Sequence, residues 1–300
     1  MKNFIIGQHG FFDYKKFRKD FRGGFYGIEA CLLDSEEDIE NLAAEACRNN
    51  LKIGIHYPLR GKVHKHRDPQ FLASAADVRH GFFNSIKTEL DYISDKGLKP
   101  EYILFHYPKP VILNKQHDWS RWRFTDGSEF VYESEYSYNE FAQRSRQLFE
   151  WLAEQGEKYG FIPVLELDAV CTYIKETTLL EELLESFSEI KLCLDMARLH
   201  FQTLTDPSFN TDDILKRFSK YTVLIHLSNT RITDNTVYAH FPALPGLKPE
   251  DGWADMNNYL PIIGKINRNV KVLFEHRSDL ISDEELDKCY KWAGQLLYGV

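Results

Sequence analysis

Short apolar, β-rich runs alternate along the chain with amphipathic stretches of helical pattern, and this alternation constrains the fold more than any other feature. The runs span residues 3–8, 25–33, 51–59, 101–108, 161–170, 190–197, 221–229 and 270–278. Strands that alternate with helices form parallel sheets covered on both faces. Eight such units in 300 residues predict an α/β fold, a single (β/α)8 TIM barrel over 1–300.

An open doubly wound sheet is the alternative. That fold commonly carries a glycine-rich phosphate loop after its first strand, and the segment GQHGFF (7–12) lacks the GxGxxG pattern. Helices are expected over 34–50, 68–97, 138–160, 177–187, 211–220 and 282–297. Two longer insertions, about 109–138 and 230–258, follow the fourth and seventh strands, at the end of the barrel where such enzymes build their sites.

Composition narrows the class of protein. A net charge of −8 gives no reason to expect nucleic acid or an anionic membrane as a partner. The chain has no apolar run of about 18 residues that could cross a membrane, and its first residues lack the pattern of a signal peptide. Its five cysteines are scattered singly, as reduced thiols are. We therefore expect a soluble, cytoplasmic protein.

Six of the eight runs carry a metal-capable side chain near the C-terminal end: His56, His106, Glu166, Asp195, His226 and Glu275. A single buried histidine in a strand is more often a hydrogen-bonded core residue than a ligand. In a closed barrel, however, inward side chains at matching heights converge on one small volume. Three carboxylates gathered there would repel one another unless a cation compensates them. The pattern predicts a divalent metal ion, with Zn²⁺, Mn²⁺, Co²⁺, Fe²⁺ and Mg²⁺ as candidates.

Side-chain alternation along a strand extends this prediction. If His226 points inward, Leu224 and Ser228 do so too, while Ile225 and Leu227 face the helices. The same rule places small or apolar residues below the polar ones: Cys193 below Asp195, Val164 below Glu166 and Leu273 below Glu275. These residues would form the packed floor of a barrel beneath a polar site.

The order Glu166, Asp195, His226 and Glu275 on the fifth to eighth strands resembles the xylose isomerase-like TIM barrels. That superfamily includes sugar and sugar-phosphate isomerases and epimerases and, more distantly, endonuclease IV-type endonucleases. Further matches are YGIEA (26–30), IHLSN (225–229) and HFPALPGLKPEDGW (240–253), although the family's second glycine is absent from the last. The resemblance implies that the four residues hold a metal ion and that Glu166 and Glu275 are also the catalytic acid/base pair.

In endonuclease IV-type members, histidines at the positions of His56 and His106 hold a further zinc ion, so the resemblance leaves a second metal at these residues open. Two departures argue against the complete endonuclease cluster. The family's histidine three residues after the sixth-strand aspartate is Arg198 here. The family also has an aspartate two residues before its late histidine. In this chain the late histidine is His240, and Tyr238 stands at the position of that aspartate.

These patterns favour a metal-dependent isomerase or epimerase that acts on a sugar, sugar phosphate or related hydroxy-ketone by proton transfer through a metal-stabilised enediolate. The side chains expected to bind this carbohydrate-like substrate are His56, His106, Arg198, Arg277, His240 and Lys62. Lys62 belongs to the basic segment 60–67, which would capture an anionic group or simply be a solvated charged loop.

Two alternatives stay open. One is a metal-dependent hydrolase or lyase of the endonuclease IV-like type with a binuclear site, disfavoured because the insertion continues with the acidic stretch DGSEFVYESEYSYNE (126–140). The other is a barrel that binds a ligand without catalysis. The aromatic insertion at 117–138 would then be a lid or a contact in a homo-oligomer.

Overall fold

Eight parallel strands close into a barrel in the computed structural model, which describes residues 1–300 apart from 64–66, 123, 234–235 and 300. The strands are β1 (Phe4–His9), β2 (Gly27–Cys31), β3 (Lys52–His56), β4 (Tyr102–Tyr107), β7 (Ile162–Leu167), β8 (Lys191–Asp195), β9 (Thr222–His226) and β12 (Lys271–Phe274). They pair in the closed order β1-β12-β9-β8-β7-β4-β3-β2. Seven of them lie within predicted runs and β1 extends one residue past the run 3–8, so the closed barrel confirms the TIM-barrel prediction.

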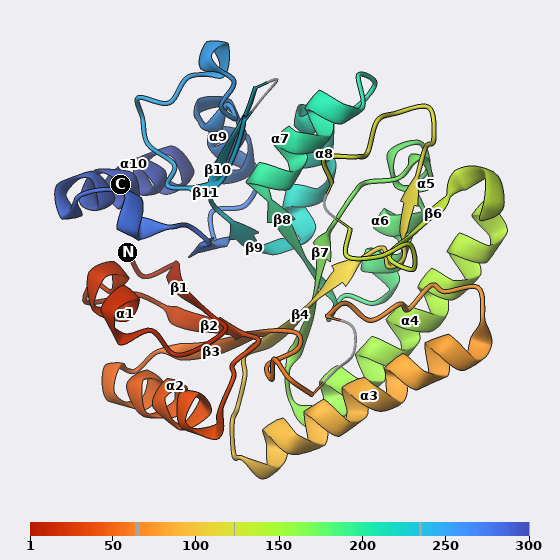
Figure 1. Ribbon diagram of the computed structural model, residues 1–300, viewed down its shortest axis with the longest axis horizontal. Helices are drawn as coiled ribbons and strands as arrows, with labels where there is room; N and C mark the ends of the chain where they lie inside the picture. Colours follow the sequence, from red (N-terminus) through yellow and green to blue (C-terminus); the bar gives the residue numbers. More distant parts are fainter. Residues whose placement is uncertain (64–66, 123, 234–235, 300) are drawn as a thin grey trace.

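Helices surround these strands (Figure 1). They are α1 (Tyr14–Asp20), α2 (Glu36–Asn49), α3 (Ala76–Asp95), α4 (Tyr138–Tyr159), α5 (Thr172–Lys175), α6 (Leu179–Ser186), α7 (Met196–Thr205), α8 (Thr211–Phe218), α9 (Met256–Ile266) and α10 (Asp283–Tyr298), with short 3₁₀ turns at Glu133–Glu135, Ser219–Tyr221, Pro249–Asp251 and Ser278–Leu280. Ser137 and Ser282 begin α4 and α10 with capping boxes, each satisfying a backbone N–H that the helix itself cannot. No helix in the described part of the chain is both long and apolar enough to span a membrane.

The helix predicted over 68–97 is too long at its N-terminal end, because α3 begins only at Ala76. Asp68 and Gln70 are instead buried. Helices α1, α5, α7 and α9 were not predicted; α7 begins at Met196, inside the run 190–197 that was read as a strand. The apolar pattern alone does not show where that strand ends. The strand ends at Asp195, because the side chain of Asp195 caps the N-terminus of α7.

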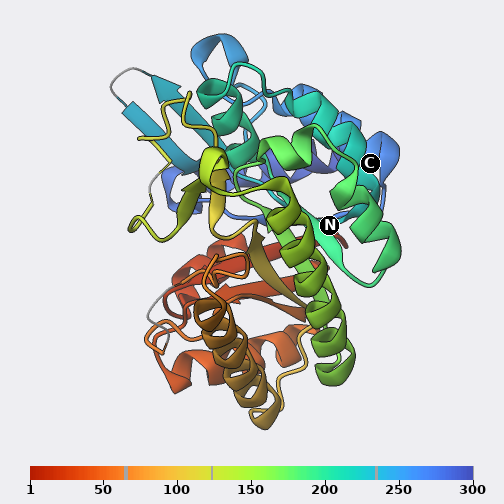
Figure 2. The same cartoon turned by 90° about the vertical axis from the view of Figure 1, so that its right-hand side faces the viewer.

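Both insertions contain small sheets. β5 (Val111–Leu113) pairs with β6 (Phe130–Tyr132) in the first, and β10 (Asn229–Thr233) pairs with β11 (Thr236–Phe241) in the second. Figure 2 shows both insertions projecting from the same side of the barrel. That side is the one at which the barrel strands end.

Two shells of apolar residues fill the fold. Inside the barrel, one cluster contains Ile5, Tyr102, Leu104, Val164, Cys193, Leu224 and Leu273. Ile225 and Leu227 belong to the larger cluster, which includes residues of the surrounding helices. The predicted alternation is therefore correct, and the inner cluster forms an apolar floor directly beneath the polar strand ends. Burying each large apolar side chain contributes roughly 1.5–3 kcal/mol to folding.

Candidate metal centre

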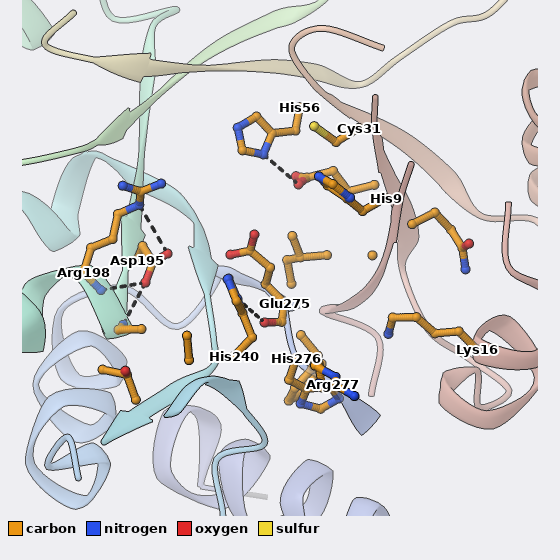
Figure 3. A pocket seen from close by; sticks show the side chains of 18 of the residues that line it. His9, Lys16, Cys31, His56, Asp195, Arg198, His240, Glu275, His276 and Arg277 are labelled. Carbon is orange, nitrogen blue, oxygen red and sulfur yellow. Dashed lines mark hydrogen bonds and ion pairs between the residues drawn. The ribbon is translucent and has the colours of Figure 1, made fainter. Parts of the chain in front are cut away.

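The six predicted strand-end residues gather above this floor. In the register of the barrel, His106 lies opposite Glu166 and Asp195 lies opposite His226. Glu275 follows directly after β12. Five of the six are buried, whereas the Glu275 side chain is 33% exposed and lines the pocket above. Figure 3 shows the side chains of Asp195 and Glu275 in this pocket, with Arg198 beside Asp195.

The potential ligand atoms of Glu166, Asp195, His226 and Glu275 lie close together. His226 Nδ1 lies 3.4 Å from Glu275 Oε2 and 3.6 Å from Glu166 Oε1. Glu166, Asp195 and His226 each offer a ligand atom within 4.8 Å of the others. Ligands about 2.0–2.2 Å from a shared ion are spaced in this way.

The hydrogen bonding of these groups also fits a cation. Both ring nitrogens of His226 and Oε2 of Glu166 are buried without a hydrogen-bond partner among the described residues. Buried polar atoms in native proteins are almost always paired, and leaving one unpaired costs about 1–3 kcal/mol. A divalent ion bound by His226 Nδ1 and the carboxylates would satisfy the orphaned nitrogen and neutralise the negative charge. The residues therefore fit a metal ion.

Asp195 has its carboxylate fixed by the chain itself. Its Oδ1 accepts hydrogen bonds from the backbone N–H groups of Ala197 and Arg198, which begin α7. Burial, followed by repulsion from Glu275 and Glu166, raises the pKa of Asp195 to about 6. Burial alone would also raise the pKa of Glu166, but His226 and His106 outweigh it and hold that pKa well below its usual range. Both carboxyl groups are thus ionised at pH 7, but as the pH falls below about 6 Asp195 takes up a proton before Glu166 does.

Replacing Asp195 with Asn is expected to flatten the pH dependence of stability in the metal-free protein. The carboxyl has an ordinary pKa of 3.8 and a folded-state pKa of about 6. Its contribution to the free energy of unfolding is therefore complete below about pH 3.8 and is lost as the pH rises through about 6. Urea unfolding of parent and variant in a chelator, from about pH 4 to 7, measures this difference. Parallel pH profiles for the two proteins would contradict it.

His56 and His106 form a second group with Glu166. His106 Nε2 lies 3.1 Å and His56 Nε2 3.9 Å from Glu166 Oε2. His106 Nδ1 lies 3.0 Å from Asp68 Oδ2. The structure therefore brings both predicted histidines to the site, with Glu166 between them and His226.

Arg198 places a permanent positive charge next to this second group. Its Nη1 donates to Asp168 Oδ1 over 2.8 Å, and its Nε lies 3.4 Å from Glu166 Oε1. Its Nη2 is 3.4 Å from His106 Nε2. Because the guanidinium already contacts Glu166 and His106, it opposes a second metal ion at that position.

A buried network behind Arg198 was not predicted from the sequence. The Lys109 ammonium, 3% exposed, lies 2.8 Å from Asp168 Oδ2 and 3.0 Å from Asp68 Oδ2. Burial lowers the pKa of Lys109, but Asp168 and Asp68 outweigh it and raise that pKa. Trp122, from the first insertion, donates its indole N–H to Asp168 Oδ1. The insertion is thereby anchored to the same network as Arg198.

The remaining predicted substrate-binding residues lie at different depths. His240 and Arg277 line the pocket: His240 Nδ1 is 3.2 Å from the backbone oxygen of Glu275, and Arg277 pairs with Asp279 at the surface. Lys62 is 73% exposed, lies 3.3 Å from Asp34, and is not among the described residues that line the pocket. Residues 64–66 of the same basic segment lie outside the described residues.

The pocket over the site has a volume of about 650 Å³, within the range of small-molecule sites. Sequence reasoning missed several side chains that line it, among them Gln8, His9, Glu29 and Phe201, whereas Arg67 of the basic segment 60–67 and Trp122 of the aromatic insertion also line it. Glu29 could have been found, because it interrupts an apolar strand run just as the six predicted residues do. Phe201 and Trp122 form an aromatic wall, with ring centroids 5.1 Å apart.

Comparison with known proteins gives a likeness of structure only. No protein-family profile and no curated protein matches the sequence. Among solved structures, the IolI protein with a bound zinc atom has a TM-score of 0.61 to this chain at 14% identity, over 97% of each chain. The chain shares the fold of this protein, a (β/α)8 barrel.

Two further structures support this conclusion. The 3-keto-D-glucoside 4-epimerase YcjR of E. coli, in its apo form, has a TM-score of 0.59 at 14% identity, over 97% of this chain and 98% of its own. A xylose isomerase domain-containing protein of Salmonella typhimurium LT2 has a TM-score of 0.53 at 14% identity, over 99% and 97%. The likeness expected from the strand-end residues is therefore confirmed at the level of the fold.

Proposed function

We propose that this protein is a metal-dependent isomerase or epimerase that acts on a sugar, sugar phosphate or related hydroxy-ketone. The observation that carries the proposal is the convergence of Glu166 and Glu275 on His226 Nδ1, with Asp195 at the same site. The fold shared with a 3-keto-D-glucoside 4-epimerase supports the reaction class. Zinc bound by a protein of the same fold supports the choice of a divalent ion.

The roles of the side chains follow from their placement. When bound by Glu166, Asp195, His226 and Glu275, a divalent ion supplies Lewis-acid polarisation of a substrate carbonyl and so acidifies the neighbouring C–H. Glu275 reaches the pocket and is placed to take this proton, while Glu166, which faces the same nitrogen of His226 from a deeper position, is placed to return one. His56, His106 and Arg198 would hold substrate oxygens. His240 and Arg277 at the mouth would bind its far end.

A binuclear hydrolase is the second candidate, and the grouping of His56, His106 and Glu166 favours it. The guanidinium of Arg198 beside Glu166 and the ammonium of Lys109 beside Asp68 and Asp168 count against it. Both cations neutralise carboxylates that a second metal ion would need. The proposal therefore assumes one ion per chain.

Metal content and proton exchange together test the proposal. We expect about one equivalent of a divalent transition metal in the purified protein, and metal-dependent deuterium uptake from solvent into a member of a ketose and hydroxy-ketone panel. Two equivalents, with one lost in a His56→Ala/His106→Ala variant, would favour the binuclear hydrolase, as would nicking of abasic-site DNA. Less than about half an equivalent, with no gain on adding Mn²⁺ or Zn²⁺, would count against both enzymes.

A further inference from the structure

We infer that Glu29 is the positioning residue for His226, fixing the ring so that Nδ1 presents a free lone pair to the metal position. The inference rests on the proposed function, because it assigns a role toward the proposed metal ion. Glu29 lies on β2, on the opposite side of the barrel from β8, which carries Asp195, and is 3% exposed.

The two sides of the His226 ring face different partners. On one side, Nδ1 lies 3.4 Å from Glu275 Oε2 and 3.6 Å from Glu166 Oε1. On the other side, Nε2 lies 3.5 Å from Glu29 Oε1. A histidine that ligates a metal through one nitrogen carries its proton on the other, and that N–H generally points at a carboxylate, carbonyl or water. Glu29 supplies such a carboxylate on the side away from the ligands.

Glu29 is itself held in place by Tyr102. The Tyr102 hydroxyl donates to Glu29 Oε2 over 2.7 Å, which leaves Oε1 facing His226. Tyr102 belongs to β4, whereas Glu29 is on β2, so the tyrosine ring has to cross over β3 inside the barrel. The connection from Tyr102 through Glu29 to His226 therefore starts in the apolar floor and crosses the barrel interior to the candidate centre.

This crossing depends on the residue between the two strands. Gly54 on β3 is the register partner of both Glu29 and Tyr102. A Cβ at position 54 would lie 2.2 Å from Tyr102 Cζ and 2.3 Å from its hydroxyl oxygen, far inside van der Waals contact. Glycine at this position thus gives the tyrosine ring the space it needs to reach Glu29.

Two other groups, one near the Glu29 carboxylate and one near the His226 ring, are weaker candidates for this interaction. His56 Nδ1 lies 3.9 Å from Glu29 Oε1, farther than His226 Nε2 does. The neutral thiol of Cys193 packs in the inner cluster beneath the site and is a weak hydrogen-bond partner. A carboxylate orients an imidazole N–H more strongly than a thiol does, because the bond is charge-assisted.

The affinity for Co²⁺ and Zn²⁺, measured by competition with a chelator on the full chain, tests the inference. Glu29→Leu removes the acceptor and is expected to weaken binding about 10–100-fold and to alter the Co²⁺ absorption spectrum. Glu29→Gln keeps an acceptor of the same shape and should restore most of the affinity. Tyr102→Phe should cause a smaller loss, and it serves as the second variant if Glu29→Leu does not fold.

Glu89→Gln is the matched control, since Glu89 is equally buried but pairs with Arg60 outside the barrel. It should lower thermal stability and leave the metal affinity unchanged. If the role of Glu29 is purely structural, Glu29→Leu should be less stable than the parent when no metal is present, yet it should bind metal as tightly as the parent does. That result would overturn the inference.

The remaining outcomes are equally distinct. If Cys193→Ala weakens binding and Glu29→Leu does not, the thiol orients the ring and the inference is wrong. If the parent protein binds none of Co²⁺, Zn²⁺ and Mn²⁺, the proposed function fails, and the role of Glu29 fails with it. Tight binding by the parent and by Glu29→Leu alike leaves the proposed function standing and rejects only the role of Glu29.

Discussion

Replacing Glu275 with Gln is expected to slow the exchange of a substrate C–H with solvent deuterium by about 10²–10⁴-fold, the usual contribution of a positioned acid or base. Glutamine keeps the shape and the oxygen of the side chain but cannot accept the proton. Glu275 is the more accessible of the two proposed acid/base residues, with a third of its side chain exposed to the pocket. The measurement is deuterium incorporation by NMR or mass spectrometry at saturating metal.

Glu166→Gln should give a loss of similar size, but part of it will come from weaker metal binding. Glu166 is buried and contacts His106, His226 and Arg198, so neutralising it disturbs all three. Titrating the metal separates the two effects, because lost affinity is recovered at high metal concentration and lost proton transfer is not. Glu250→Gln, at an exposed carboxylate on a surface turn, is the matched control and should exchange as fast as the parent. Exchange at the parent rate in both glutamine variants of the site would show that the acid/base assignment is wrong.

The sequence predicts the barrel strands and the strand-end residues for the same physical reason. Parallel strands buried on both faces need continuous apolar runs, so a charged or imidazole side chain near the end of a run is conspicuous. Closure of the barrel then brings those ends together, whatever their separation along the chain. His56 and Glu275 are far apart in sequence yet border one pocket.

Other parts of the site depend on contacts that no periodic pattern encodes. Lys109 meets Asp68 and Asp168 only because the segments after β3, β4 and β7 come together at one end of the barrel. Of these three residues, only Asp168 could have been predicted from its neighbours in the sequence. It lies two residues after Glu166, and the alternation of side chains along a strand gives both the same orientation. Glu29 had the same kind of signal, a carboxylate within an apolar run. The prediction stopped at the six residues nearest the strand ends and so missed both.

The network around Lys109 leads to the largest expected change in stability. Lys109→Met should lower the free energy of unfolding by about 3–5 kcal/mol, because it removes one partner of a buried ion pair and leaves charge uncompensated. Lys109 is the shared cation of Asp68 and Asp168, and all three side chains are buried. His106 remains beside Asp68 and Arg198 beside Asp168, which places the effect toward the lower end of that range. Urea unfolding in the presence of a chelator measures the effect without a contribution from metal.

Lys220→Met is the matched control, since Lys220 pairs with Glu185 over 3.3 Å at the surface, where both side chains are more than half exposed. Exposed pairs of this kind contribute about 0–1 kcal/mol, so this variant should unfold close to the parent. Adding Asp68→Asn and Asp168→Asn to Lys109→Met should recover part of the loss, because the uncompensated carboxylates are then gone. If Lys109→Met unfolds within about 1 kcal/mol of the parent, the remaining cations, Arg198 beside Asp168 and His106 and Arg67 beside Asp68, neutralise both aspartates. Arg198 would then be needed to neutralise Asp168 and would be less free to bind substrate. The residue that stabilises this network would in that case limit the proposed binding of substrate.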